Sequence, residues 1–485
     1  MSNGIKKTGL ILIGIITGMM LSLNFSAIAK KDSIEAIHPL PIEELRTFAQ
    51  VFGRIKSDYV ESVEDKKLIT EAINGMLVGL DPHSSYLDKD DYKELQIGTQ
   101  GEFGGLGIQV TMEDGVVKVI SPIEDTPAFR AGIKTGDLIV KLDDTVVKGM
   151  TLNDAIKLMR GKPKTSIKIT IMREGETEPL IFNLVRDIIK IQSVKSKMIE
   201  PGYAYIRITQ FQEQTGENLA QAIRTLFAEN TGSMKGLILD LRNDPGGLLN
   251  GAVAVSAAFL PENALVVYTE GRSADAKMKL HANPEYYLRG PDDDYLKGLP
   301  SEVKTVPMIT LVNGGSASAS EIVAGALQDH KRSIVMGSQT FGKGSVQTIL
   351  PLGNNTAIKL TTARYYTPNG QSIQAQGITP DILDETDNGD DQRLREADLN
   401  RHLSNGKKAE KKKTASEAEK AALKPAGDKK EKKNKDKKDK EKDKDKDRTP
   451  IEFGSAEDLL LTQAMNYFKG ITSSPEKKSD EKTDS

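Results

Sequence analysis

The sequence predicts an α/β core, an open mixed sheet with covering helices, into which a β-rich unit is inserted and which a helical region precedes. Three patterns support this prediction. Strand-like apolar runs alternate with helical stretches from about residue 194 to residue 366, strand-like alternation with glycines fills residues 101–173, and two stretches with helical spacing come before them. At 485 residues the chain is too long for one core, so two or three domains plus non-globular segments are expected.

The amino-terminal stretch has the features of an export signal. Lys6 and Lys7 precede an apolar run from Gly9 to Ile28, and Ala27-Ile28-Ala29 has the small-x-small form of a signal-peptidase site. The run is longer than a usual signal core, although small and polar residues dilute it. A cleaved signal peptide and a retained membrane anchor therefore both stay open for residues 1–29.

Two amphipathic helices are expected next. Apolar residues recur at helical spacing from Ile42 to Val60 and again from Lys66 to Leu80. These helices either pair with a second copy of the chain or pack onto the chain's own core. His83 follows in a turn after Asp81, and it is interpreted as a structural turn residue because no carboxylate other than Asp81 lies at ligand spacing.

Residues 101–173 form a self-contained unit with a clear helix start. Alternating runs that begin at Ile108 and Val116 predict strands, and Thr151 with Asp154 makes a capping box before an apolar helix face that Gly161 ends. The order of these elements and their glycines resembles a PDZ domain. In PDZ domains a glycine-rich loop binds the terminal carboxylate of a peptide, which adds to the domain as a strand.

This resemblance places the carboxylate-binding loop at Gly105-Leu106-Gly107-Ile108. Leu106, Ile108, Ile156 and Met159 would line the pocket for the last side chain, and because all four are apolar, an apolar carboxy-terminal residue is expected. Glycines at this spacing would otherwise suggest a tight turn or a phosphate loop. No Lys or Ser/Thr follows in P-loop position, which argues against nucleotide binding.

Strands and helices alternate after about residue 194. The run Gly236–Leu241 predicts a buried strand, the turn from Arg242 to Gly247 follows it, and a small-residue helix covers Leu249–Phe259. In open α/β sheets the loops at the carboxyl ends of the strands form the site. Gly246 and Gly247 lie in such a loop, although two glycines could also merely turn the chain.

The stretch from Val306 to Gln347 is the most informative in the chain. Its apolar run Met308–Val312 predicts a buried strand, which breaks at three small or polar residues before a helix from about Ser318 to Gln328. The Ser318 hydroxyl is thus placed at a helix N-terminus, where unpaired N–H groups and the helix dipole favour an oxyanion. Lys343 follows between two glycines, and lysine can activate a serine once burial lowers its pKa.

These residues resemble the carboxy-terminal processing proteases, also called tail-specific proteases. The family's S-A-S-A-S-E-I and T-F-G-K-G-S-V-Q runs stand intact, and the resemblance spans most of the chain between about residues 40 and 385. It implies that Ser318 is the nucleophile, Lys343 the general base, and Gln347, one helical turn later, the side chain that orients the lysine. It further implies an oxyanion hole made by the N–H of Ala319 and a glycine N–H from Gly246 or Gly247.

A Ser-His-Asp arrangement is the main rival, because Asp329 and His330 follow the serine helix. On a helix that begins at Ser318, these residues lie about 17 Å along the axis at 1.5 Å per residue, so neither reaches the hydroxyl. Asp329 is expected to be structural. A hydrolase of small esters with a Ser-His pair and a non-catalytic PDZ scaffold in the cell envelope stay as alternatives, although a scaffold would need neither Ser318 nor Lys343.

The folding pattern fails from about residue 385. Between Lys407 and Arg448 there are 19 basic and 11 acidic side chains in a low-complexity tract that cannot bury a core. A solvated linker is expected there, with weak attraction to anionic headgroups or wall polymers as the alternative. Residues 456–468 then predict a short amphipathic helix that docks on the folded body. The absence of cysteine excludes a thiol nucleophile, disulfides and Cys-ligated zinc.

Together these features predict an exported serine endopeptidase that recognises the carboxy-terminal tail of protein substrates and cleaves with a Ser-Lys dyad. No metal or other cofactor and no nucleic acid partner is implied. The expected location is the bacterial periplasm, or the inner membrane facing it, and a homo-oligomer through the N-terminal helices and an activating adaptor are further expectations. The expected domains are residues 1–29, signal or anchor; 34–98, helical region; 99–190, PDZ domain; 191–385, protease core; 386–450, charged linker; 451–471, C-terminal helix; and 472–485, disordered tail.

Overall fold

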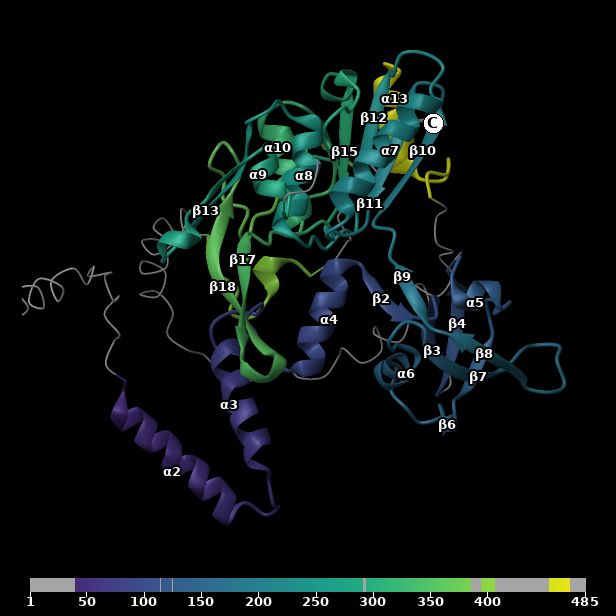
Figure 1. Cartoon of the computed structure of the whole chain (residues 1–485). Coiled ribbons are helices and arrows are strands. Elements are labelled where there is room, and N and C mark those ends of the chain that lie inside the picture. The colour runs from purple at the N-terminus through teal and green to yellow at the C-terminus, as the bar shows by residue number, and fades with distance from the viewer. Residues whose placement is uncertain are drawn as a thin grey trace, which may run out of the picture. The chain divides into compact units, whose positions relative to one another are not determined.

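The computed structural model describes residues 40–113, 115–123, 125–290, 294–384, 394–405 and 453–471 (Figure 1). The chain divides into two compact units, residues 1–72 and residues 73–485. The predicted signal or anchor, the charged tract and the tail lie outside the described residues. Within the described ranges, no helix combines the length and the apolar character needed to span a membrane.

The first unit contains α2 (Ile42–Asp58) and the first half of α3 (Asp65–Val78), which confirms the two predicted helices. The polar side of α2 carries ion pairs one turn apart, such as Arg54 with Asp58 at 3.1 Å. No residue of α2 is buried, and the apolar side chains of Leu45, Phe48 and Val51 are 46–53 % exposed. This helix therefore presents an uncovered apolar stripe.

The inserted unit is an antiparallel sheet in the order β3-β4-β5-β7-β8, with β6 paired to β5, and two helices. Alternate side chains such as Val117 and Val119 are fully buried and pack with Ala155 of α6, which confirms the β-rich prediction. The elements are β3 (Ile108–Glu113), β4 (Val116–Pro122), α5 (Pro127–Arg130), β5 (Leu138–Leu142), β6 (Thr145–Val146), α6 (Leu152–Met159), β7 (Ser166–Met172) and β8 (Leu180–Val185), flanked by the ribbon of β2 (Glu102–Gly105) with β9 (Asp187–Lys190).

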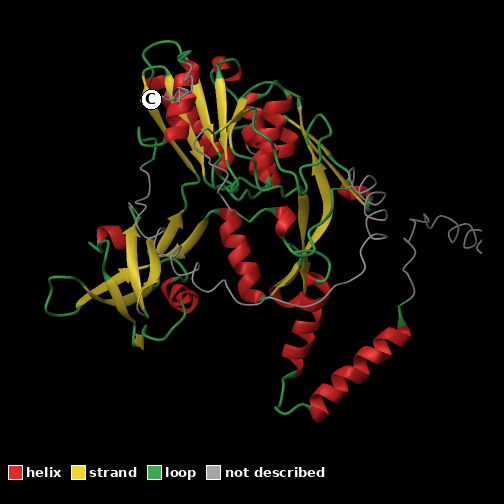
Figure 2. Cartoon of the chain, turned by 180° about the vertical axis from the view of Figure 1, so that it is seen from behind, coloured by secondary structure: helices red, strands yellow, loops and turns green. Residues whose placement is uncertain are grey.

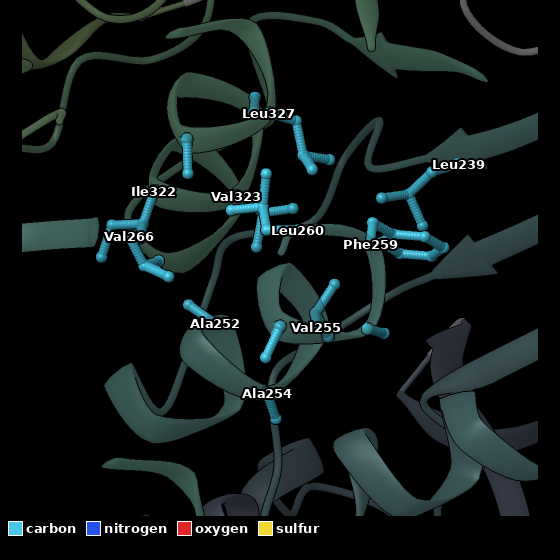
Figure 3. Packing of buried hydrophobic residues seen from close by; sticks show 14 of the residues in the cluster. Leu239, Ala252, Ala254, Val255, Phe259, Leu260, Val266, Ile322, Val323 and Leu327 are labelled. Atoms are coloured by element: carbon cyan, nitrogen blue, oxygen red, sulfur yellow. The ribbon is translucent and has the colours of Figure 1, made fainter. Parts of the chain in front are cut away.

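A six-stranded sheet in the order β10-β11-β12-β15-β16-β19 forms the main core of the second unit. Its strands are parallel except for the β10–β11 pair, as the predicted open mixed sheet requires. Leu239 packs with Val255 and Val323 of two covering helices (Figure 3), whereas Ile238 contributes to the opposite face. The elements are β10 (Val194–Glu200), β11 (Tyr203–Ile208), α7 (Thr215–Glu229), β12 (Gly236–Asp240), α8 (Leu249–Phe259), β15 (Met308–Val312), α10 (Ala319–Asp329), β16 (Ile334–Gly337) and β19 (Ile382–Leu383).

A second sheet, which is antiparallel, carries the strand that follows Lys343. β18 pairs with β17, β1 and β13, and β14 extends the sheet beyond β13. β18 is the last of the strand-like runs that the sequence predicts up to about residue 366. The elements are β1 (Ser85–Leu87), α4 (Lys89–Gln100), β13 (Leu265–Gly271), β14 (Lys279–His281), α9 (Pro284–Tyr287), β17 (Ser345–Leu352) and β18 (Thr356–Tyr366).

The predicted C-terminal helix docks on the core sheet. Leu460, Leu461 and Met465 of α13 (Leu459–Phe468) are buried against Ile238 and its neighbours, on the face opposite α7, α8 and α10. Figure 2 shows helices on both sides of these strands. The chain therefore completes its main core with a helix that follows the other core elements in sequence.

Residues 394–405 fall within the predicted linker, but they pack on the core. The Glu396 side chain is fully buried, its N–H donates to the carbonyl of Phe341 at 3.1 Å, and Arg395 donates to the carbonyl of Gln376 at 2.9 Å. Assigning these residues to a linker was wrong. A short segment fixed by polar contacts shows no apolar periodicity, so the sequence pattern gave no sign of it.

Candidate active site

Ser318 lies on a strained turn between β15 and α10. Its backbone has φ 55° and ψ −111°, a conformation that non-glycine residues rarely adopt. The helix begins at Ala319, so Ser318 is the N-cap residue, as the sequence predicted. The turn places Ser318 at the N-terminus of α10, where backbone N–H groups have no partner within the helix.

Lys343 occupies a second turn, directly before β17. Gly342 has φ 99°, and a Cβ on Gly344 would lie 2.3 Å from the backbone nitrogen of Gln374, so both flanking glycines are required by conformation or close approach. The lysine is partly buried. Burial, with a smaller contribution from the charge of Lys359, lowers the pKa of Lys343 to about 8. The free amine is therefore accessible near neutral pH, as a general base requires.

Glu321 connects the serine and lysine turns. Its Oε2 accepts the N–H groups of Ser318 at 2.8 Å and Lys343 at 2.9 Å, and its Oε1 accepts Thr340 Oγ1 at 2.6 Å and the N–H of Gly342 at 2.7 Å. Glu321 is fully buried, and burial raises its pKa to about 7, although each of the four hydrogen bonds lowers that pKa. All four partners are donors, which favours the ionised carboxylate. Sequence analysis missed this role, although the Ser318-x-x-Glu321 spacing of a capping box was visible.

Tyr365 closes the site from β18. Its hydroxyl donates to the carbonyl oxygen of Lys343, and the side chain is 2 % exposed. Burial raises the pKa of the Tyr365 phenol well above its ordinary value, while a hydrogen bond with Ser318 acts in the opposite direction. The tyrosine therefore stays protonated and holds the lysine turn; the sequence offered no signal for this contact.

The two candidate glycines have different surroundings. Gly246 is buried, and its N–H donates to Asp244 Oδ1 at 2.8 Å, whereas Gly247 is exposed and borders the cleft beside Ser318. Among the described residues, neither the N–H of Gly247 nor that of Ala319 has a hydrogen-bond acceptor. A Cβ on Gly246 would lie 2.8 Å from the nitrogen of Ala319, so the two turns are in close contact. The geometry thus leaves the N–H groups of Gly247 and Ala319 available.

Gln347 lies on strand β17, and its predicted place one helical turn after Lys343 was wrong. The Gly342-to-Gly344 turn leads directly into a hairpin, and Gln347 pairs in register with Thr361. Its amide nitrogen donates to Ser345 Oγ at 3.0 Å and Thr361 Oγ1 at 3.3 Å. Gln347 nevertheless borders the same cleft as Lys343.

Two polar chains behind the lysine turn were not predicted. Asp81 accepts the hydroxyl of Thr361 at 3.0 Å, which links Gln347 to the turn before β1. His83 pairs with Glu396 at 2.7 Å, so it is more than a local turn residue. Glu396 in turn accepts the amide of Gln374, whose oxygen accepts the N–H of Gly344. Some of these contacts join residues about 300 positions apart, which no local pattern can indicate.

The rival base lies far from Ser318. His330 is the C-cap residue of α10, and its Nε2 contacts the carbonyl oxygen of Leu265 at 2.7 Å. Asp329 accepts the N–H of Asn369 at 2.8 Å, in agreement with the structural role predicted for it. The geometry therefore gives no support to a Ser-His-Asp arrangement at this serine.

A cleft of about 990 Å³ contains these groups. Ser318, Ala319, Gly247, Lys343 and Gln347 border it. Its remaining walls are mostly apolar and include Phe211, Leu249, Leu280, Ile322 and Val346. In the described part of the chain, no group of three or more His, Asp or Glu side chains is arranged to hold a metal ion. The cleft can thus hold an extended apolar segment next to the Ser318 hydroxyl.

The predicted peptide groove of the inserted unit is partly internal. Leu106 is 3 % and Met159 6 % exposed, whereas Ile108 and Ile156 are only partly buried. Gly107 has φ 77°, and the N–H groups of Leu106 and Gly107 find no acceptor among the described residues. Two N–H groups without an acceptor next to apolar side chains are what the terminal carboxylate of a peptide requires.

Comparisons with known proteins identify the family of the chain. Residues 202–383 match the model of peptidase family S41, residues 104–184 that of the PDZ domain, and residues 13–91 that of the activating protease CtpB N-terminal domain. The carboxy-terminal-processing protease of Bartonella bacilliformis is 48 % identical over 375 residues, 76 % of this chain and 82 % of that protein.

Two further proteins are similar to this chain. The carboxy-terminal processing protease CtpA of Bacillus subtilis is 36 % identical over 69 % of this chain and 67 % of its own length. The solved photosystem II D1 C-terminal processing protease is 30 % identical over 69 % of this chain and 86 % of that chain, with a TM-score of 0.39. The chain belongs to the carboxy-terminal processing proteases of peptidase family S41 and is a serine-type endopeptidase with a PDZ domain.

Proposed function

We propose that the enzyme cleaves protein tails with a Ser318–Lys343 dyad. The observation that carries the proposal is the single Glu321 oxygen that accepts the N–H groups of both residues, because it fixes the two turns side by side. In the acylation step, the Lys343 amine takes the proton of the Ser318 hydroxyl as its oxygen attacks the peptide carbonyl. The Lys343 ammonium then protonates the leaving amine of the substrate. The Lys343 amine that remains later activates the water that releases the acyl group.

The N–H groups of Ala319 and Gly247 are proposed to bind the oxyanion. Both are free of acceptors within the described residues, and the helix N-terminus at Ala319 favours negative charge. The N–H of Gly246 donates to Asp244, so Gly246 is proposed to stabilise the turn instead. Gln347 is proposed to orient Lys343 from the neighbouring strand, together with the hydroxyls of Ser345 and Thr361.

The pH dependence follows from the lysine. Because only the free amine accepts the serine proton, kcat/KM is expected to rise with pH through about 8, where Lys343 loses its charge. Lys359→Gln removes a neighbouring positive charge that lowers the Lys343 pKa, so the rise should move to higher pH. His330→Ala should leave the profile unchanged. The measurement is kcat/KM on an internally quenched peptide from pH 6 to 10, and a limb that vanished with His330 would refute the dyad.

Tail recognition is proposed to reside in the PDZ domain. The donors at Leu106 and Gly107 suit a carboxylate, and the apolar groove offers no partner to a charged last residue. An amidated tail or a tail ending in Asp is therefore expected to be cleaved at least about tenfold more slowly than the same substrate with a free apolar end.

A matched pair of variants locates the effect. Ile156→Asp places a charge on the groove side of α6, whereas Leu158 on the same helix is 39 % exposed, so Leu158→Asp serves as the control. Leu106 is unsuitable, because it is buried in the PDZ core and its replacement would unfold the domain. Equal cleavage of free and amidated tails by the wild type would leave a general protease without tail recognition.

Export and assembly complete the proposal. The apolar run after Lys6 and Lys7 suits export to the periplasm, either with cleavage or as an anchor.

The uncovered apolar stripe of α2 suits pairing with a second copy of the chain, and an activating adaptor is proposed to act in the same region. The molar mass of the protein in solution, measured by light scattering, tests the pairing.

A further inference from the structure

We propose that Asp458, at the start of α13, is a positioning residue for the oxyanion loop, residues 241–247, and that it acts through Arg242. The inference rests on the proposed function, in which the N–H of Gly247 binds the developing oxyanion. It assigns to the C-terminal helix a part in catalysis beyond covering the sheet.

The Arg242 side chain lies between two carboxylates. On one side Nε donates to Asp240 Oδ1 at 3.0 Å and Nη2 to Asp240 Oδ2 at 2.7 Å. On the other, Nη1 and Nη2 donate to Asp458 Oδ1 and Oδ2 at 2.9 and 2.5 Å. Both contacts are bidentate, which fixes the plane of the guanidinium as well as its position.

The surroundings make this arrangement rigid. Asp240 is fully buried and also accepts the hydroxyl of Tyr205 at 2.6 Å, while the Arg242 side chain is 15 % exposed. Asp458 Oδ1 accepts the N–H of Leu461 at 3.1 Å, so the same carboxylate caps α13. Burial raises the pKa of Asp458, but the hydrogen bonds and charge of Arg242 outweigh it and hold that pKa below its ordinary value.

A shift of Arg242 would be passed along the oxyanion loop to Gly247. The loop begins where the N–H of Arg242 donates to Asp240 at 2.9 Å, and it ends at Gly247, where a Cβ would lie 2.1 Å from the carbonyl oxygen of Phe211. Asp244 accepts the N–H of Ala317 on its carbonyl at 3.0 Å, which joins the loop to the serine turn. These contacts tie the loop at its start, its middle and its end.

Docking of the helix does not depend on this ion pair. Leu460, Leu461, Ala464 and Met465 are 0–5 % exposed against the sheet, so apolar contacts dock the helix. Removing one partner of the buried ion pair still costs stability, and the test must therefore separate folding from positioning. The ion pair is a bidentate contact with the first part of the loop, and it therefore also fixes the position of that loop.

The test compares two inhibitors on the full-length protein. A tail-derived peptide aldehyde adds to the serine and places its oxygen in the oxyanion hole, whereas the matching peptide alcohol binds the same subsites without forming an oxyanion. The ratio of their inhibition constants therefore measures the oxyanion hole separately from the fraction of folded enzyme. In Asp458→Asn, the preference for the aldehyde is expected to fall at least about tenfold, with the alcohol constant unchanged.

The control is Met465→Ala, which removes a buried contact of the same helix without touching Arg242. It should lower the melting temperature and leave the aldehyde preference unchanged. An unchanged preference in Asp458→Asn, or an equal loss in Met465→Ala, would overturn the inference. Asp458→Ser, which also caps a helix, gives the same comparison if the Asn variant does not fold. A wild type without any aldehyde preference would refute the Ser318 assignment itself, and this inference with it.

Discussion

Replacing Ser318 by alanine is expected to stop cleavage of an unstructured protein substrate, and Lys343→Ala is expected to do nearly the same, each with a loss of about 10⁴-fold or more in turnover. The two groups act as one unit, because the hydroxyl is a poor nucleophile until the amine takes its proton. Mass spectrometry of the digest measures the loss. The melting temperature should change little, since neither side chain is part of the hydrophobic clusters.

Lys359 supplies the control for the lysine variant. It borders the same cleft, but Lys343 stays in place when Lys359 is replaced by alanine, so most of the activity should survive at high pH. Near-normal turnover in Lys343→Ala, or equal losses in both lysine variants, would contradict the dyad.

Glu321→Gln is expected to have the second-largest effect, a loss of about 10²-fold in kcat together with about 2–3 kcal/mol of stability. The amide is isosteric with the carboxylate, but its NH₂ group must face two of the four donors that now point at Glu321. With the NH₂ in place of Oε2, the serine and lysine turns lose the acceptor that they share; with the NH₂ in place of Oε1, the N–H of Gly342 beside Lys343 loses its acceptor. Steady-state kinetics and thermal unfolding measure the two effects.

Val323→Ala separates positioning from stability. Val323 is fully buried on the same helix and packs only into the apolar core cluster, so its truncation should cost about 1–2 kcal/mol and leave kcat per folded molecule near that of the wild type. Glu321→Gln with the kcat of Val323→Ala would mean that the carboxylate merely stabilises the fold.

The predictable part of the site was local in sequence. The strand before Ser318, the helix after it and the flexible glycines around Lys343 follow from apolar periodicity, helix capping and backbone freedom, and the structure has all of them. The open mixed sheet was predictable for the same reason, because each strand and helix shows its own period.

The unpredicted part depends on distant contacts. The sequence predicts Gln347 on a helix because four positions make one turn. The β-branched residues Val346, Thr348 and Ile349 equally favour a strand, and pairing with β18 decides the outcome. His83 with Glu396 and Arg242 with Asp458 join residues that only the fold brings together. A carboxylate such as Glu321 shows in sequence that it caps a helix, but its second set of partners comes from another turn.

The position of α13 in the sequence also affects the order in which the protein can mature. In a chain synthesised from its amino terminus, β10 to β19 are made before Leu460, Leu461 and Met465. The face of the sheet around Ile238 and Leu311 therefore stays exposed to solvent until these residues follow. During that interval the apolar face is open to solvent and to other chains. A protease assembled in this order acquires its finished hydrophobic core only after the serine and the lysine have both been synthesised, which delays the appearance of a fully folded enzyme in the newborn chain.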